Sequence, residues 1–346
     1  MPKNAIQSKS KRTRKPPIYT IGIDLGGTKV AAGLVNRNGA LISEVHRPTV
    51  PAELENQNPR LKGRQPSASE VRHHISYVTR AMSDAAIELL DSHPNCHLSG
   101  VGLASAGPMN VEKGTLDLPA NFRGWKIVPL VRLFASELAR RGVRQPVYFQ
   151  NDAVAAALGE GWVGRAKGCA TYAMITVGTG IGSGVILNGR PSQSRGMGSE
   201  WGHMLIETRG LGADRGSFDS RSVESIASGT GLVRRARAAG LPCETAHELA
   251  ELTRAKNPAA LQLFSQASEA LAALFYNLSL GYHLEKIVVS GGMLAVKEFF
   301  LPEAIAIYRE IMLAKNRAFL APVQAAQLGT KAGVIGAARL PALGSF

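Results

Sequence analysis

Two short segments of this sequence combine glycines with a threonine hydroxyl, which suits the binding of phosphate groups. The first is Asp24-Leu25-Gly26-Gly27-Thr28-Lys29, and the second runs from Gly178 through Thr179 and Gly180 to Gly184. Glycine lets backbone N–H groups approach phosphate oxygens without a Cβ clash, and threonine adds a hydroxyl donor. Each segment by itself could be a hairpin that merely turns the chain. As a pair, they indicate two turns that hold a nucleotide from both sides.

Two carboxylates stand where predicted strands end. Asp24 follows the first predicted strand and is well placed to hold Mg²⁺, most simply through water, as this ion prefers. Asn151-Asp152 follows another predicted strand and opens a helix. A carboxylate at Asp152 can accept the proton of a substrate hydroxyl as it attacks phosphorus. Asn and Asp are also favoured helix N-caps, but capping explains only one of the two residues.

Glu200-Trp201-Gly202-His203 places a carboxylate and an imidazole three residues apart. The neighbouring hydroxyls of a sugar each need a hydrogen-bond donor and an acceptor, which this pair supplies. A metal site is the alternative, but no second histidine or cysteine lies nearby. We therefore interpret Glu200 and His203 as candidates for sugar binding, with a purely structural histidine as the remaining alternative.

Alternating strands and helices must position these groups. The residue pattern predicts strands over 18–23, 30–35, 40–46, 100–105, 147–150, 171–177, 185–187 and 286–289. Helices are predicted over 70–92, 153–159, 258–283 and 330–339. Because strand, glycine-rich turn and strand occur twice, about 150 residues apart, the sequence indicates a weak duplication at the scale of a domain.

Length and charge bound the class of protein. A chain of 346 residues is long for one core, which favours two domains. The net charge is +14, but six basic residues lie within the first 15 positions. We expect residues 1–17 to form a basic, disordered tail, with contact to nucleic acid or a membrane surface as the alternative. A nucleic-acid partner is not expected, because the chain shows no interleaved aromatics and no segment of DNA-binding-domain size before Ile18.

Cysteine usage and hydropathy point to the cytoplasm. The three cysteines lie far apart and form no CxxC motif, as in reduced proteins: Cys96, Cys169 and Cys243. No apolar run approaches the ~20 residues that a membrane helix needs. Pro16-Pro17 interrupts the region where a signal peptide would be apolar. We expect a cytoplasmic protein without a membrane partner.

In combination and order, these motifs resemble the ROK family (repressors, open reading frames and kinases) of the actin-like and hexokinase-like ATPases. The resemblance runs from about Ile18 to Leu340, and its further markers are Glu224, Ala227-Ser228-Gly229 and Ser290-Gly291-Gly292. It implies an α/β fold of two ribonuclease-H-like lobes with an interlobe cleft. The N-terminal lobe would comprise residues 18–150 joined by the C-terminal helix at about 328–341, and the C-terminal lobe residues 151–327.

The resemblance implies ATP-dependent phosphorylation of a hexose with Mg²⁺, carried out by a homodimer. Asp152 would be the general base, the two glycine turns would hold phosphates, and Gly291 and Gly292 would lie against the adenosine. Glucose is the expected substrate, and the alternatives are an N-acetylglucosamine or N-acetylmannosamine kinase or a non-catalytic sugar-binding regulator. The family's sugar-binding positions correspond here to Asn121, Asn151, Glu200, His203 and Glu224.

One departure from the family pattern concerns zinc. Between the histidine and Glu224 the family typically carries three cysteines that bind structural zinc together with that histidine. Arg215, Ser217 and Ser222 occupy those positions here, and none of them supplies a thiolate. A site with one histidine would lack three of the four ligands that zinc needs. We therefore expect a zinc-free loop over 210–221, with His203 held by hydrogen bonds alone.

Overall fold

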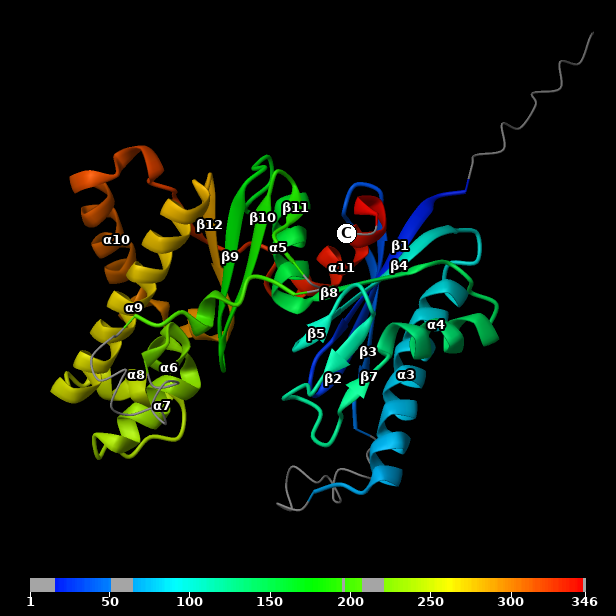
Figure 1. Cartoon of the computed structure of the whole chain (residues 1–346), viewed down its shortest axis with the longest axis horizontal. Coiled ribbons are helices and arrows are strands. Elements are labelled where there is room, and N and C mark those ends of the chain that lie inside the picture. Colours follow the sequence, from blue (N-terminus) through cyan, green and yellow to red (C-terminus); the bar gives the residue numbers. More distant parts are fainter. Residues whose placement is uncertain (1–15, 51–64, 195–196, 207–220, 345–346) are drawn as a thin grey trace, which may run out of the picture.

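The computed structural model describes residues 16–50, 65–194, 197–206 and 221–344. Most of the predicted basic tail, and the predicted zinc-free loop up to residue 220 with Arg215 and Ser217, lie outside these residues. Within them, the chain forms two five-stranded sheets that stand side by side (Figure 1). Among the described helices, none combines the length and the apolar character that crossing a membrane would require.

The two sheets have the same topology. The first has the order β3-β2-β1-β4-β8 and the second the order β11-β10-β9-β12-β13. In each sheet the first strand in the chain pairs antiparallel with the second and parallel with the fourth. The strands of the first sheet are β1 (Ile18–Leu25), β2 (Lys29–Asn36), β3 (Leu41–Pro48), β4 (His97–Ser105) and β8 (Val147–Asn151). Those of the second are β9 (Tyr172–Val177), β10 (Ile181–Leu187), β11 (Arg190–Pro191), β12 (Lys286–Ser290) and β13 (Val323–Ala325). The duplication indicated by the sequence is therefore confirmed.

Helices with one apolar face cover the first sheet. Helix α3 (Ala68–Asp91) begins with a capping box in which Ser67 and Glu70 bind each other's backbone N–H groups. It buries Val78, Met82 and Leu89 at helical spacing, as predicted for residues 70–92. Helix α4 (Leu130–Arg140) packs near it. A small sheet that the sequence pattern did not predict joins β5 (Met109–Asn110), β6 (Thr115–Asp117) and β7 (Ile127–Val128).

The second sheet carries the larger helical layer. The long helix α9 (Pro258–Tyr282) begins at the Asn257 cap and ends at His283, close to the predicted limits. It buries large apolar side chains against the core of this sheet. Around it lie α6 (Val223–Ala227), α7 (Gly229–Ala238), α8 (Ala246–Arg254), the 3-10 segment η3 (Gly292–Phe299) and α10 (Leu301–Lys315). Figure 1 shows these helices on the side of the second sheet that faces away from the first.

Two helices, α5 (Asp152–Val163) and α11 (Ala332–Leu343), lie between the sheets (Figure 1). Their backbones approach so closely that a Cβ at Gly336 would lie 1.6 Å from the Ala155 carbonyl oxygen. Helix α11 also packs against β1 and β4, where a Cβ at Gly102 would lie 1.8 Å from the Ala337 oxygen. The division into lobes at 150 and 327, with the C-terminal helix in the N-terminal lobe, stays a prediction.

A buried carboxylate connects the C-terminal part of α5 to the segment that precedes α11. Glu160 of α5 is fully buried, and its Oε1 accepts hydrogen bonds from the N–H groups of Gln327 and Leu328 at 2.9 and 2.7 Å. Its Oε2 accepts one from Arg165 at 2.6 Å. Because an unmatched buried carboxylate is costly, these three donors are needed for its burial. The segment that leads into α11 is thereby held against α5.

The glycine-rich segment over 178–184 differs from its prediction as a continuous turn. Only Gly178, Thr179 and Gly180 form the turn, and β10 already begins at Ile181. Within β10, Gly184 leaves room for α5, because a Cβ there would lie 2.6 Å from the Ala153 carbonyl oxygen. That glycine therefore serves helix packing rather than the turn, a distinction that sequence spacing does not reveal.

Candidate active site

The first glycine turn presents unused backbone donors. The Gly26 N–H closes the turn on the Lys29 carbonyl at 3.0 Å. Thr49 occupies the other side: its hydroxyl donates to the Gly27 oxygen at 2.9 Å and its N–H to the Thr28 oxygen at 3.1 Å. The N–H groups of Gly27 and Thr28 donate to no acceptor in the described part of the chain. This arrangement suits an anion.

The second glycine turn is built in a similar way. The Gly178 N–H bonds to the Gly180 oxygen at 2.9 Å, and the start of α7 holds the turn's carbonyls. There the Gly229 N–H donates to Gly178 at 2.8 Å and the Thr230 N–H to Thr179 at 3.3 Å. The turn's carbonyl oxygens are thus occupied by α7, and the exposed Thr179 offers its hydroxyl.

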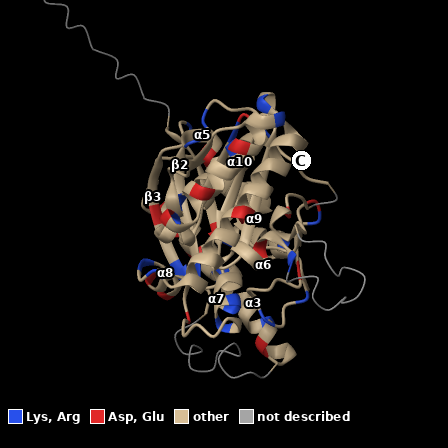
Figure 2. Cartoon of the chain, turned by 90° about the vertical axis from the view of Figure 1, so that its left-hand side faces the viewer, with Lys and Arg blue, Asp and Glu red and all other residues tan. Residues whose placement is uncertain are grey.

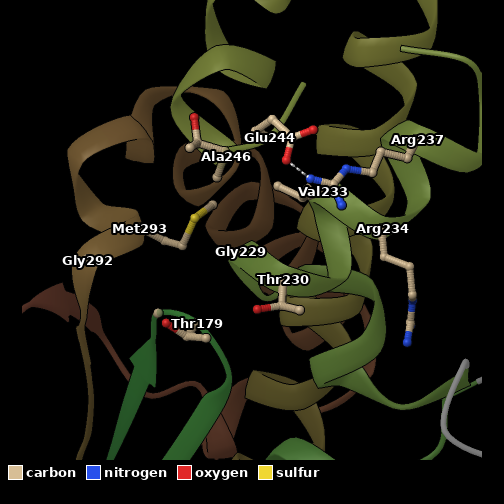
Figure 3. A pocket seen from close by; sticks show the side chains of 12 residues that line it. Thr179, Gly229, Thr230, Val233, Arg234, Arg237, Glu244, Ala246, Gly292 and Met293 are labelled. Carbon is tan, nitrogen blue, oxygen red and sulfur yellow. Dashed lines mark hydrogen bonds and ion pairs between the residues drawn. The ribbon is translucent and has the colours of Figure 1, made fainter. Parts of the chain in front are cut away.

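A cavity of about 620 Å³ lies beside this second turn (Figure 3). Thr179 and Thr230 face it from one side and Met293 and Gly292 from another, with Arg237 and Glu244 paired at its upper edge. A Cβ at Gly292 would meet nothing within 4 Å, so its backbone is open to a ligand. Gly291 is not part of the lining; its φ of +103° and a Cβ 2.2 Å from the Val177 oxygen explain why it is glycine. Of the two predicted adenosine contacts, the structure thus places Gly292 at the cavity.

Asp152 influences the titration of Asp24, although the two residues are far apart in sequence. Asp24 lies near the end of β1, where Gly333 of α11 leaves room for its carboxylate. Burial, and then the negative charge of Asp152, raise the pKa of Asp24 to about 7, against a smaller opposing effect of Lys29. Mg²⁺ in proteins is typically held by one or two carboxylates together with substrate phosphates. Asp24 forms no ion pair with a residue in the described ranges, and it lies within electrostatic reach of a second carboxylate, an environment that fits such an ion.

Asp152 is the first residue of α5, and Asn151 is its N-cap. The Asn151 side-chain oxygen accepts from the N–H groups of Ala153 and Val154 at 2.9 and 3.3 Å. One oxygen of Asp152 accepts from Ala153 at 2.8 Å. Burial raises the pKa of Asp152 against the effect of its backbone hydrogen bonds. Capping therefore accounts for Asn151, and Asp152 keeps a carboxylate oxygen for other chemistry.

Glu200, His203 and Glu224 are the predicted sugar-binding residues that follow β10 in the chain. Glu200 precedes the short 3-10 helix η1 (Trp201–His203) and His203 is its last residue, with Glu200 Oε2 and His203 Nε2 3.9 Å apart. Their side chains are 51% and 65% exposed, so both are accessible to a ligand. Burial raises the pKa of Glu200, the charges of Asp152 and Glu224 raise it further, and His203 lowers it. The three carboxylates therefore share one region.

Glu224 has a contact that the sequence did not predict. From α6, its Oε2 accepts a hydrogen bond from the Ile181 N–H at 2.7 Å, directly after the second glycine turn. A Cβ at Gly180 would lie 2.5 Å from the same oxygen. One carboxylate oxygen of Glu224, a residue predicted to bind the sugar, therefore holds the segment after the second glycine turn. The other oxygen stays available to a substrate.

The predicted sugar ligands are only partly brought together. A small pocket is lined by Asn151 and Glu200 together with Gln150 and Met197. Asn121 is an exposed residue in the loop between β6 and β7 and does not line this pocket. The structure therefore joins Asn151 and Glu200 in one pocket, and Asn121 is not among the residues that line it.

Sequence reasoning missed Gln150 and Thr49. Gln150 is 2% exposed; its Oε1 accepts from the Asn151 N–H at 2.8 Å, and its Nε2 donates to Gln193 at 2.7 Å. This hydrogen bond helps to fix the backbone of Asn151 at the end of β8. Its place directly before Asn151 was a usable signal. No local signal marked Thr49, because it lies at the start of a polar segment that reads as a loop.

For zinc, the structure describes one of the three substituted positions. Ser222 caps α6 by accepting from the Ser225 N–H at 3.1 Å, whereas Arg215 and Ser217 lie outside the described residues. Over the described ranges, no group of three or more His, Cys, Asp or Glu side chains could hold a metal ion. The zinc-free loop stays a prediction.

Known proteins resemble this chain over nearly its whole length. The ROK family matches residues 20–342. A glucokinase of Thermotoga maritima is 29% identical over 341 residues, which cover 94% of this chain and 98% of the relative. The crystal structure of a ROK hexokinase from Thermus thermophilus superposes with a TM-score of 0.75 at 29% identity, covering 94% of this chain and 98% of the other.

A second solved structure contains ligands. It is a ROK family glucokinase from Streptomyces griseus in complex with glucose and AMPPNP, with a TM-score of 0.66 and 28% identity. The alignment covers 94% of this chain and 100% of the Streptomyces griseus chain. Both structures agree with the α/β fold of two sheets and with the actin-like ATPase architecture expected from the motifs. Because the family match spans most of the chain and includes both glycine turns, this protein belongs to the ROK family.

Proposed function

We propose that this protein transfers the γ-phosphoryl group of ATP to a hydroxyl of a hexose, with glucose as substrate and glucose 6-phosphate as product. The observation that carries the proposal is the position of Asp152. Its charge acts on Asp24, beside the first glycine turn, and also on Glu200, beside the sugar-binding candidates. A single carboxylate thus lies within electrostatic reach of both the phosphate side and the sugar side.

Asp152 would act as the general base. It would accept the proton of the attacking hydroxyl, and its raised pKa makes it a better proton acceptor than an ordinary aspartate. Asn151 and the hydrogen bonds at the start of α5 would hold it in one orientation. Backbone N–H groups at Gly27, Thr28, Thr179 and Gly180, with the Lys29 ammonium, would stabilise charge on the phosphates.

Asp24 would hold Mg²⁺ through water, as this ion prefers, with Asp152 as a neighbouring carboxylate. When bound, Mg²⁺ neutralises negative charge on the transferred phosphoryl group. Asn121, Asn151, Glu200, His203 and Glu224 would bind the hexose. Since the segment of Asn121 packs in the core of the first sheet and the segments of Glu200, His203 and Glu224 pack in the core of the second, we infer that the two sheets with their helices approach each other when substrate binds, which also excludes water.

A substrate panel tests the proposal. Purified protein with MgATP is offered glucose, N-acetylglucosamine, N-acetylmannosamine and fructose, and ADP release is measured for each. We expect glucose to give the highest kcat/KM. A higher value for an N-acetylated sugar would assign the protein to that substrate instead. If calorimetry shows that a sugar binds but no sugar causes ADP release, the kinase proposal is contradicted. That result would support a non-catalytic sugar-binding regulator.

We also propose that the loop over 210–221 binds no zinc. Elemental analysis of purified protein is expected to find far less than one zinc per chain, because Arg215, Ser217 and Ser222 supply no thiolate. The matched control is a triple variant in which these three residues are cysteines, which is expected to take up zinc with His203. One tightly held zinc per wild-type chain would show that other ligands replace the cysteines.

We further propose a cytoplasmic homodimer that does not bind nucleic acid. Around α9 and α10, acidic and basic side chains are interspersed rather than gathered by sign (Figure 2). Such a distribution does not favour the phosphate backbone of a nucleic acid. Light scattering of the purified protein tests the dimer, with a mass near 36.7 kDa as the contradicting result.

A further inference from the structure

We propose that His74 is a positioning residue that fastens the loop carrying Asn121 to the first glycine turn. It does so through a chain of hydrogen bonds that includes Thr49 and Trp125. The inference rests on the proposed function, because it takes the turn to bind ATP and Asn121 to bind the hexose. In the described part of the chain, His74 makes no hydrogen bond to Asn121 or to the glycine turn; it acts through the segments that carry them.

The first part of the chain joins Thr49 to the turn. Thr49 follows β3 and is fully buried. Its hydroxyl and its backbone N–H both donate to the turn, to the oxygens of Gly27 and Thr28 at 2.9 and 3.1 Å. These bonds orient the two carbonyls toward Thr49. The position of Thr49 therefore determines the position of the turn's free N–H groups.

The second part is the imidazole of His74, on the first half of α3. Its Nε2 lies 2.9 Å from the Thr49 carbonyl oxygen, and its Nδ1 lies 3.3 Å from the indole nitrogen of Trp125. An indole N–H can only donate, so Nδ1 must be the acceptor, and Nε2 carries the proton that Thr49 accepts. The two hydrogen bonds of the imidazole then run in one direction, from the Trp125 N–H through His74 to the Thr49 carbonyl, so each strengthens the other.

The third part locates the loop that carries Asn121. Phe122 and Trp125 are each 2% exposed and stack with ring centres 4.5 Å apart at 20°. His74 packs edge-on against both rings, at 5.9 and 5.5 Å. Asn121 directly precedes Phe122 and is exposed. The buried rings are therefore the anchors that set where Asn121 points, and His74 connects them to Thr49.

Replacing His74 with phenylalanine keeps an aromatic ring between these groups and removes both hydrogen bonds. The Thr49 carbonyl and the Trp125 N–H then each lose a hydrogen-bond partner in the protein interior. The segment of Thr49 and the loop of Trp125 must move to find other partners. We expect His74→Phe to raise KM for the hexose about tenfold and KM for ATP at least about threefold. The matched control is His73→Phe, an exposed neighbour on the same helix, which is expected to change neither.

A double-mutant cycle separates positioning from a general loss of stability. Steady-state kinetics are measured for wild type, His74→Phe, Asn121→Ala and the double variant, using the hexose that the wild type phosphorylates best. If His74 acts through Asn121, its effect on the hexose KM should fall to less than about threefold once Asn121 is alanine. The melting temperature of His74→Phe should stay within about 5 °C of wild type.

Several results would overturn the inference. Unchanged KM values in His74→Phe would do so. The same holds if the hexose KM of the double variant rises by the product of the increases in His74→Phe and Asn121→Ala, because the two changes are then independent. If His74→Phe does not fold, Trp125→Phe and Thr49→Val take its place. The first is expected to raise the hexose KM and the second the ATP KM, and no change in either overturns the inference. A wild type inactive with every hexose would instead overturn the proposed function and the inference with it.

Discussion

Asp152→Asn is expected to lower kcat by at least about 100-fold while the hexose still binds. The amide has nearly the shape of the carboxylate and keeps an oxygen that can accept from the Ala153 N–H at the start of α5. What it lacks is the ability to take a proton from the attacking hydroxyl. The measurement combines an ADP-release assay with calorimetry of hexose binding.

The matched control for this change is Asp84→Asn. Asp84 is a partly exposed carboxylate of α3 that pairs with Arg141, and it lines neither of the two pockets of the candidate site. The same loss of one negative charge there is expected to leave kcat within about twofold, as exposed ion pairs contribute little. Near-normal turnover in Asp152→Asn would remove Asp152 from the role of general base.

Asp24→Asn is expected to lower kcat/KM for ATP by about 100-fold and, in the absence of ligands, to stabilise the protein. The folded state raises the pKa of Asp24 from 3.8 to about 7, so ionised Asp24 is less favourable in the folded than in the unfolded chain. Stability is therefore lost as the pH rises from about 4 to about 7 and stays lower above it. At pH 8 this cost is on the order of a few kcal/mol, and the neutral amide avoids it.

Thermal melting against pH, with and without MgATP, tests this second prediction. Without ligand, Asp24→Asn should melt several degrees above wild type at pH 8, and the difference should shrink toward pH 4. With MgATP, the wild type should gain more stability than the variant, because ligand binding to the folded state stabilises it. A variant that is both less stable at pH 8 and fully active would contradict the role of Asp24.

Much of the framework could be predicted from local sequence. The first glycine turn and the start of α5 lie where their residues indicated. Local rules succeed here because a turn or a cap depends on a few neighbouring residues, such as Asn151 accepting from the N–H groups two and three positions ahead. The repeated strand order was also indicated, since each half repeats the same succession of strand and turn.

Packing between distant segments decided the rest. The sequence shows two aspartates at strand ends, but only the fold brings Asp152 close enough to raise the pKa of Asp24. Likewise, Gly184 reads as part of a turn and proves to make room for α5. The link from Thr49 to Trp125 joins three separate segments through His74, and no spacing rule spans them. Backbone preferences act over a few residues, whereas burial, charge coupling and side-chain hydrogen bonds depend on which surfaces meet, and that is settled only when the chain has folded.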